Sequence, residues 1–184
     1  MLPELRRHRG YTLVELMMVL AIAAVLGTLA LPAFGGLLGR TREGAAVTEL
    51  QASLNQARIE AVNRNLHVVV CPSGGGDDCT RTSAWQRGWI AFTDLDRNGR
   101  RSGREPLLAR GTAPAGVGIV ASAGRQRVNF QPDGSATGTN LTLTVCSQAA
   151  GAAGARTVVV SQVGRIRHGS ASPAAAGTCL AAID

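Results

Sequence analysis

One apolar segment near the N-terminus constrains this chain more than any other feature of its sequence. Between Tyr11 and Gly39 the only charged side chain is Glu15. As a helix, the 21 residues from Tyr11 to Leu31 rise roughly 31 Å, which is about the thickness of the hydrocarbon core of a bilayer. We therefore predict a membrane-spanning helix within residues 11–39.

The residues that flank this segment narrow its interpretation. Residues 6–9 read Arg-Arg-His-Arg, and positive charge before an apolar run keeps that end of a helix in the cytoplasm. A cleaved secretory signal has a similar basic start, but its apolar region is only about 7–15 residues long. A simple signal anchor leaves Glu15 unexplained, because an unpaired acid in the membrane costs roughly 2.5 kcal/mol or more. A free amine made by cleavage just before Tyr11 would be a partner for that acid.

The sequence Gly10-Tyr11-Thr12-Leu13-Val14-Glu15 resembles the class III signal of type IV pilins and pseudopilins. The resemblance implies that a prepilin peptidase cleaves after Gly10 and that Tyr11, where the family usually has Phe, is then N-methylated. It implies that Glu15 pairs with the terminal amine of a neighbouring subunit, which removes two unpaired charges from lipid during filament assembly. It also implies a single-pass protein of the bacterial inner membrane, with a periplasmic head, that joins other pilins in a pilus or pseudopilus.

Beyond the apolar segment the hydrophobic pattern changes period. Residues 40–65 are typical of an amphipathic helix whose apolar residues recur at spacings of three and four. This stripe comprises Val47, Leu50, Leu54, Ala57 and Ala61. From residue 66 onward, short β-prone runs alternate with turn residues at a spacing close to that of a small antiparallel sandwich. The predicted strands are Leu66–Cys71, Gly88–Thr93, Pro106–Arg110, Val117–Ala121, Arg127–Gln131, Leu141–Cys146, Thr157–Ser161 and Gly164–His168.

The head carries a second resemblance. Leu66–Ser73, Trp85–Thr93 and the Asp94–Gly99 turn leading to Glu105–Leu108 are similar to the GspH/FimT family, which includes minor pilins of type IV pili and a pseudopilin of type II secretion. The resemblance covers nearly the whole chain and implies an α+β, pilin-like fold with a long N-terminal helix packed on a small antiparallel head. The predicted organisation is a leader over 1–10, a transmembrane half-helix over 11–39, an amphipathic half-helix over 40–65 and a head over 66–184.

The four cysteines have a meaning that depends on the compartment. A head in the periplasm or outside the cell lies in an oxidising environment. Cys71 and Cys79 flank a short Gly/Asp loop, whereas Cys146 and Cys179 flank a longer excursion. We predict the disulfides Cys71–Cys79 and Cys146–Cys179, with two other connectivities possible. The competing interpretation, a zinc site, requires more closely spaced Cys and His pairs.

The segment Asp94–Glu105 matches the spacing of a calcium-binding loop. The oxygen donors of that template are Asp94, Asp96, Asn98 and Glu105. Four arginines within the same twelve residues oppose the binding of a dication. The favoured interpretation is therefore a polar hairpin turn in which Asp and Asn side chains bond to their own backbone, with calcium as the alternative.

The motif most informative about function is Gly164-Arg165-Ile166-Arg167-His168. On a strand or a hairpin limb, Arg165 and Arg167 share one face about 7 Å apart, where each guanidinium can clamp a phosphate and His168 can add a third donor. The motif resembles the G-R-x-R element of FimT-type minor pilins, which implies that Gly164, Arg165 and Arg167 bind double-stranded DNA during natural transformation. The alternative is a solvated edge strand whose arginines discourage edge-to-edge pairing.

Composition limits how such a surface can bind DNA. The net charge is +7, all 19 basic residues are Arg, and only 3% of residues are aromatic. We therefore expect weak, sequence-insensitive and salt-dependent binding to the DNA backbone rather than base stacking.

The chain lacks the motifs of an enzyme. We find no partnered nucleophile, phosphate-binding loop or cofactor motif, and so expect no catalysis and no cofactor. We predict a DNA-binding minor pilin. The alternative is the type II secretion pseudopilin H, a structural subunit that has no need of the Arg165/Arg167 pair.

Overall fold

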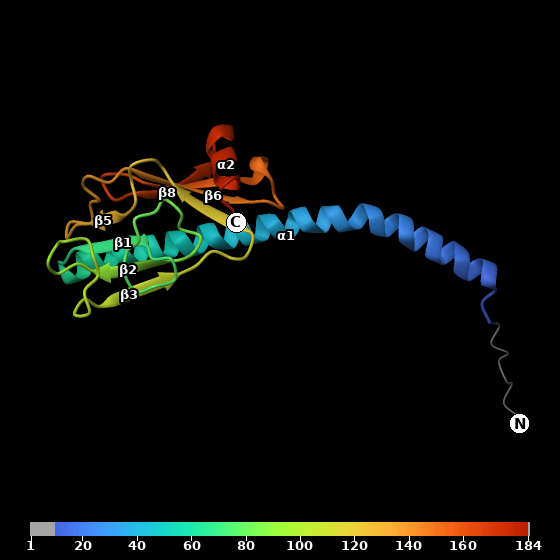
Figure 1. The fold of residues 1–184 in the computed structure, drawn as a ribbon, viewed down its shortest axis with the longest axis horizontal. Coiled ribbons are helices and arrows are strands. Elements are labelled where there is room, and N and C mark those ends of the chain that lie inside the picture. The colour runs from blue at the N-terminus through green and yellow to red at the C-terminus, as the bar shows by residue number, and fades with distance from the viewer. Residues whose placement is uncertain (1–9, 184) are drawn as a thin grey trace, which may run out of the picture. The chain divides into compact units, whose positions relative to one another are not determined.

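The computed structural model describes residues 10–183, with the side chains of residues 29–33 excepted (Figure 1). The chain divides into two compact units, one ending at Gly35 and the other beginning at Gly36. Helix α1 runs over Leu13–Arg64 and contributes to both units. Residues 1–9 of the predicted leader lie outside the described residues. No helix in the described part of the chain is both long enough and apolar enough to span a membrane.

The second unit contains the predicted β-rich head. Its described strands are β1 (Val68–Pro72), β2 (Trp89–Thr93), β3 (Leu107–Gly111), β4 (Val117–Ala121), β5 (Val128–Phe130), β6 (Leu141–Ser147), β7 (Arg156–Val160) and β8 (Ile166–Ser170). Each coincides with a predicted strand, with its ends displaced by at most two residues. Two further elements are the 3₁₀ turn η1 (Ala152–Gly154) and helix α2 (Pro173–Leu180), neither of which was predicted.

Within the described residues the strands form two four-stranded antiparallel sheets. Their orders are β3-β2-β1-β5 and β4-β6-β7-β8, so that β5 and β8 are edge strands. Figure 1 shows the portion of α1 from Gly36 onward running alongside the strands. The α+β pilin-like fold predicted from the sequence is confirmed.

The apolar stripe predicted on residues 40–65 is the side of α1 that faces the core. All five of its residues are buried, and they share one hydrophobic cluster with both sheets. Val70 and Trp89 represent the first sheet in that cluster, and Leu143 and Val158 the second. Because the stripe contacts both sheets, it joins them into a single core.

Both predicted disulfides are confirmed. Cys71–Cys79 closes the loop after β1, with a sequence separation of 8 residues. Cys146–Cys179 links β6 to α2 across 33 residues and is buried with Ala155 and Ala176. Helix α2 begins with Ser172 as its N-cap, whose side chain accepts the Ala175 N–H at 3.3 Å, and with Pro173 in the first turn.

The core also contains one carboxylate on α1. Glu43 is 1% exposed and borders a cavity of about 260 Å³ that is also lined by Arg40, Arg156 and Ser170. Burial raises the pKa of Glu43 to about 6, because removal from water disfavours the charged form more than the charge and backbone amide of Arg156 favour it.

We predict that Glu43 makes the head less stable as the pH rises from 4.5 to above 6. The folded pKa is raised, so the unfolded chain loses this proton first and the folded state must hold an unfavourable buried charge above pH 6. The loss is no more than about 2 kcal/mol, because the folded pKa of about 6 stands only a little above the unfolded value of 4.5. Urea denaturation across this pH range should show that Glu43→Gln flattens the dependence, whereas Glu49→Gln, at an exposed position of the same helix, leaves it in place. An unchanged pH profile in Glu43→Gln would contradict the prediction.

Candidate nucleic-acid interface

The Gly-Arg-Ile-Arg motif lies at the turn between β7 and β8. The Ser161 carbonyl accepts the Gly164 N–H at 2.8 Å, and the Ser161 N–H donates to the Arg165 carbonyl at 3.0 Å. Gly164 has φ +76°, a left-handed conformation that suits a glycine in a tight hairpin. Gly164 therefore shapes the turn that presents the arginines.

A second glycine turn and an arginine of α1 hold this turn in place. Arg58 donates from Nε to the Gly134 carbonyl at 2.8 Å and from Nη2 to the Val163 carbonyl at 3.4 Å. A Cβ at Gly164 would collide with the Gly134 carbonyl oxygen. The two turns thus meet at backbone distance, and one guanidinium ties both to the helix.

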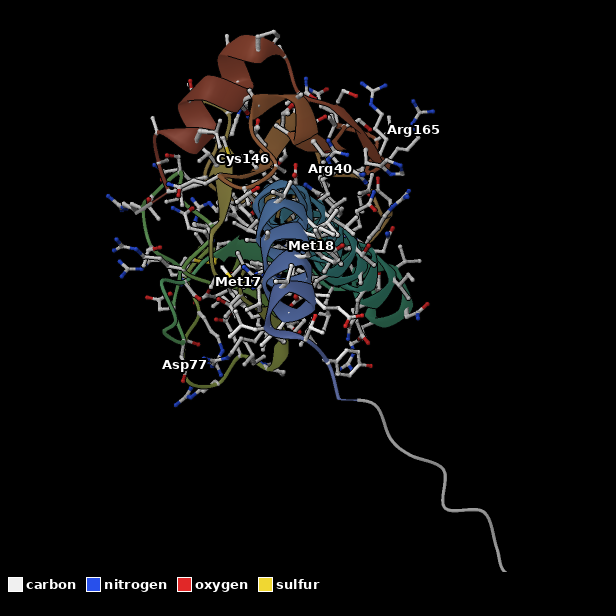
Figure 2. All side chains as sticks on the ribbon, turned by 90° about the vertical axis from the view of Figure 1, so that its right-hand side faces the viewer. Met17, Met18, Arg40, Asp77, Cys146 and Arg165 are labelled. Atoms are coloured by element: carbon white, nitrogen blue, oxygen red, sulfur yellow. A yellow bond between two sulfur atoms is a disulfide. The ribbon has the colours of Figure 1, made fainter. Side chains whose placement is uncertain are left out.

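The predicted strand Gly164–His168 begins two residues later, so that the motif lies on the limb of a hairpin and only part of it belongs to a strand. Arg165 lies in the turn, and only Ile166 onward belongs to β8. Both Arg165 and Arg167 are exposed, and among the described residues neither guanidinium has a hydrogen-bond or ion-pair partner. Figure 2 shows Arg165 projecting outward from the ribbon of the head. The pair is thus available to an external ligand.

His168 is placed differently from the prediction that it adds a third donor. Because side chains alternate along a strand, His168 shares the face of Ile166 and lies opposite to Arg167. Its cross-strand partner is the buried Val158, and its Nδ1 lies 3.1 Å from the side-chain amide nitrogen of Gln51 on α1. His168 therefore contacts the helix, on the other side of the strand from Arg167.

The loop of the calcium template has the hydrogen bonds of a polar turn. Glu105 accepts the N–H groups of Leu95 and Ser102 at 2.8 and 2.7 Å, and Asp94 accepts that of Gly99 at 3.0 Å. Asp96 likewise accepts the N–H of Asn98 at 3.1 Å. Carboxylate oxygens of Asp94, Asp96 and Glu105 lie within 4.8 Å of one another. Most of this oxygen set is engaged by backbone donors, which supports the polar-turn interpretation over calcium.

At the start of α1, the predicted assembly residues lie together. Thr12 Oγ1 accepts the Glu15 N–H at 3.3 Å, which is the first half of a capping box. Tyr11, Glu15, Leu16 and Val19 line one small open cavity. Glu15 is itself exposed, so its carboxylate is accessible to a partner.

Aromatic side chains take no part in the surface of the head. Trp85, Trp89, Phe92 and Phe130, the aromatic residues of the second unit, are all fully buried. Any nucleic acid on this unit would therefore be held by charge and hydrogen bonds rather than by base stacking.

The comparisons with known proteins agree with this fold and with the N-terminal motif. The family model described as type II transport protein GspH matches residues 46–164, more than half of the chain, and the prokaryotic N-terminal methylation motif matches residues 5–31. The chain belongs to the type IV pilin-like GspH/FimT family. It is a minor pilin or pseudopilin of a type IV filament system, a family whose members associate with other pilins.

Individual relatives support the same assignment. The pilin-like protein PilA1 of Thermus thermophilus is 32% identical over 175 residues, which cover 87% of this chain and 97% of the relative. The type IV minor pilin FimU of Pseudomonas aeruginosa superposes with TM-scores of 0.56 and 0.54 in two crystal forms, at 22% identity. The first of these matches covers 73% of this chain and 92% of FimU. This likeness concerns the fold alone.

We predict that Gly164→Ala destabilises the head more than Gly138→Ala does. The two glycines have the same φ of +76°, but an added Cβ meets the Gly134 carbonyl at Gly164 and open space at Gly138. Gly138→Ala should cost about 1–2 kcal/mol, the strain of a left-handed residue, and Gly164→Ala should cost more. Denaturant titration of both variants measures the difference, and equal losses would contradict the close contact between the two turns.

Proposed function

We propose that this minor pilin binds double-stranded DNA without sequence preference, through Arg165 and Arg167, for uptake in natural transformation. The observation that carries the proposal is the pair of exposed guanidiniums with no partner among the described residues. Arg165 lies on the turn that Arg58 fixes to α1, and Arg167 lies on the strand that follows it. A fixed turn lowers the entropy lost when the arginines engage a ligand.

The chemistry of this surface suits the DNA backbone. A guanidinium donates two parallel hydrogen bonds to phosphate oxygens and keeps its charge at any physiological pH. The formal net charge of +7 favours the approach of a polyanion. With the aromatic residues of the head buried, contacts to phosphate supply the affinity, so binding weakens steeply with salt.

Processing and assembly form the second part of the proposal. We infer that a prepilin peptidase cleaves between Gly10 and Tyr11, that Tyr11 is methylated, and that Glu15 guides assembly with other pilins. The match to the N-terminal methylation motif supports this proposal. The same proposal includes a single-pass position in the bacterial inner membrane, a periplasmic head, and no enzymatic activity or cofactor.

A structural role as pseudopilin H of type II secretion is the second candidate. The name of the matching family model, a type II transport protein, favours it. The position of Arg167 on the edge strand β8 is also compatible with it, because charged side chains on an edge discourage pairing between sheets.

We predict that Arg165→Gln/Arg167→Gln removes most DNA binding by the full-length protein in mild detergent. Each lost phosphate contact should reduce the slope of log affinity against log salt by about 1. Fluorescence anisotropy with a labelled duplex at several salt concentrations measures both quantities. Arg97→Gln/Arg104→Gln is the matched control, because it removes two exposed arginines and the same charge from another loop. Equal affinities of the two double variants would overturn the assignment of DNA binding to this turn.

A further inference from the structure

We propose that a second site on the head, a pocket beside the Cys71–Cys79 disulfide, binds one phosphate group. The pocket has a volume of about 180 Å³, and its lining includes the two cysteines and Gly99. Its polar lining consists of Thr80, Arg81, Asn98, Arg100, Gln126 and Arg127. Three arginines therefore line one small cavity, and no Asp or Glu is among its lining residues.

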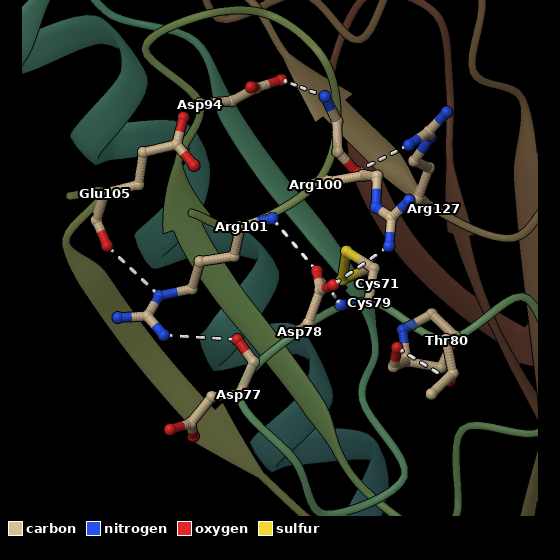
Figure 3. Close-up of a disulfide and its surroundings, with 12 residues drawn as sticks. Cys71, Asp77, Asp78, Cys79, Thr80, Asp94, Arg100, Arg101, Glu105 and Arg127 are labelled. Atoms are coloured by element: carbon tan, nitrogen blue, oxygen red, sulfur yellow. Dashed lines mark hydrogen bonds and ion pairs between the residues drawn. A yellow bond between two sulfur atoms is a disulfide. The ribbon is translucent and has the colours of Figure 1, made fainter. Parts of the chain in front are cut away.

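Arg127 is held in the pocket by the turn that resembles a calcium loop. Its Nη1 donates to the Gly99 carbonyl at 2.7 Å (Figure 3). Gly99 has φ +69°, and a Cβ at this position would collide with the Arg127 guanidinium. The Asp94 carboxylate, which accepts the Gly99 N–H at 3.0 Å, fixes this backbone in turn. Asp94 and Gly99 therefore position the guanidinium of Arg127.

Arg100 belongs to the same turn and is only loosely paired. Its backbone N–H donates to Asn98 Oδ1 at 2.6 Å, whereas its guanidinium lies 3.6 Å from an Asp78 oxygen. Both side chains of that pair are substantially exposed, so the ion pair contributes little stability. Arg100 can therefore turn toward an anion in the pocket at low cost.

Arg81 is the third arginine of the lining and follows the disulfide loop in sequence. It follows Cys79 by two residues, is exposed, and has no hydrogen-bond or ion-pair partner among the described residues. The disulfide fixes the backbone of this loop relative to β1. Cations from three separate loops thus converge on one place, and their mutual repulsion is relieved when an anion binds between them.

The shape and chemistry of the pocket select a phosphate group rather than a base. The lining offers forked donors and amide or hydroxyl groups, with no aromatic surface on which a base would stack. A phosphodiester of the DNA backbone and free inorganic phosphate share this chemistry. The DNA source rests on the proposed function, in which the pocket would add a phosphate contact separate from Arg165 and Arg167.

The test has two arms, each with full-length protein in mild detergent. In the first arm, anisotropy with a labelled duplex in a salt series compares Arg81→Gln, Arg100→Gln and Arg127→Gln with the wild type. Since the pocket holds one phosphate, loss of this contact reduces the salt slope by at most about 1 in any of the three variants. In the second arm, thermal unfolding is compared in sodium phosphate and in sodium chloride of equal ionic strength. Phosphate at ten times its dissociation constant should raise the wild-type midpoint by about 3 °C, and the pocket variants should lose this shift.

Arg97→Gln and Arg104→Gln are the controls, since these exposed arginines lie on the same turn but do not line the pocket. If only the pocket variants show both a reduced salt slope for DNA binding and a reduced thermal shift in phosphate, the ligand is a DNA phosphate. If they show only the reduced thermal shift, the pocket is a site for free phosphate. The proposal is overturned if the pocket variants behave like the controls in both arms.

The test also separates the pocket from the proposed function. Wild-type protein that binds no DNA contradicts the proposed function, and the phosphate arm then still shows whether the pocket binds phosphate. Arg81→Gln keeps the test valid if Arg127→Gln disturbs the turn, because Arg81 makes no structural bond in the described residues.

Discussion

The burial of one apolar stripe of α1 against both sheets is the interaction on which the rest of the head depends. Leu50 and Leu54 are fully buried in a cluster that contains side chains from β1, β2, β4, β6 and β7. Each four-stranded sheet alone would leave one apolar face in water, and the stripe supplies the surface that covers both. The loops that carry the exposed arginines are therefore anchored to a single core, so that their positions relative to one another are set by packing.

Polar contacts between this core and the loops then position the charged side chains of the surface. Arg58 reaches from α1 to two backbone carbonyls and fixes the turn that bears Arg165. Asp94 and Glu105 bond to backbone amides and fix the turn that bears Arg100. In both places a buried or half-buried side chain fixes the backbone of a turn, and that turn carries an exposed arginine: Arg165, whose guanidinium has no partner among the described residues, and Arg100, which is loosely paired with Asp78. The turns of the head are thus fixed by buried carboxylates and by Arg58, while the arginines that they carry are exposed.

Local sequence patterns predicted the elements of this fold well, because strand propensity, turn residues and helical periodicity are local properties. The eight strands, both disulfides and the buried stripe of α1 were all foreseen. Helix α2 was missed, although Ser172 before Pro173 is a helix start signal and alanine favours a helix, because a segment of 8 residues is too short to show a helical period.

Contacts between segments that are distant in the chain could not be predicted from the sequence. Arg58 falls on a polar face of the helical pattern, and nothing near it indicates that it binds the turns at Gly134 and Val163. Two other arrangements could not be predicted for the same reason, because each joins residues that are far apart in the chain. They are the contact of His168 with Gln51 and the pocket lined by Arg81, Arg100 and Arg127. The raised pKa of Glu43 also depends on packing that a single sequence does not reveal.

The central claim is that this filament subunit binds DNA for uptake. The most direct test uses a deletion strain of a naturally transformable host, in which both duplex DNA uptake and protein secretion are measured. The account expects that loss of the gene abolishes uptake, that the wild-type gene restores it, that Arg165→Gln/Arg167→Gln does not, and that secretion is unaffected throughout. Normal uptake together with lost secretion would contradict it.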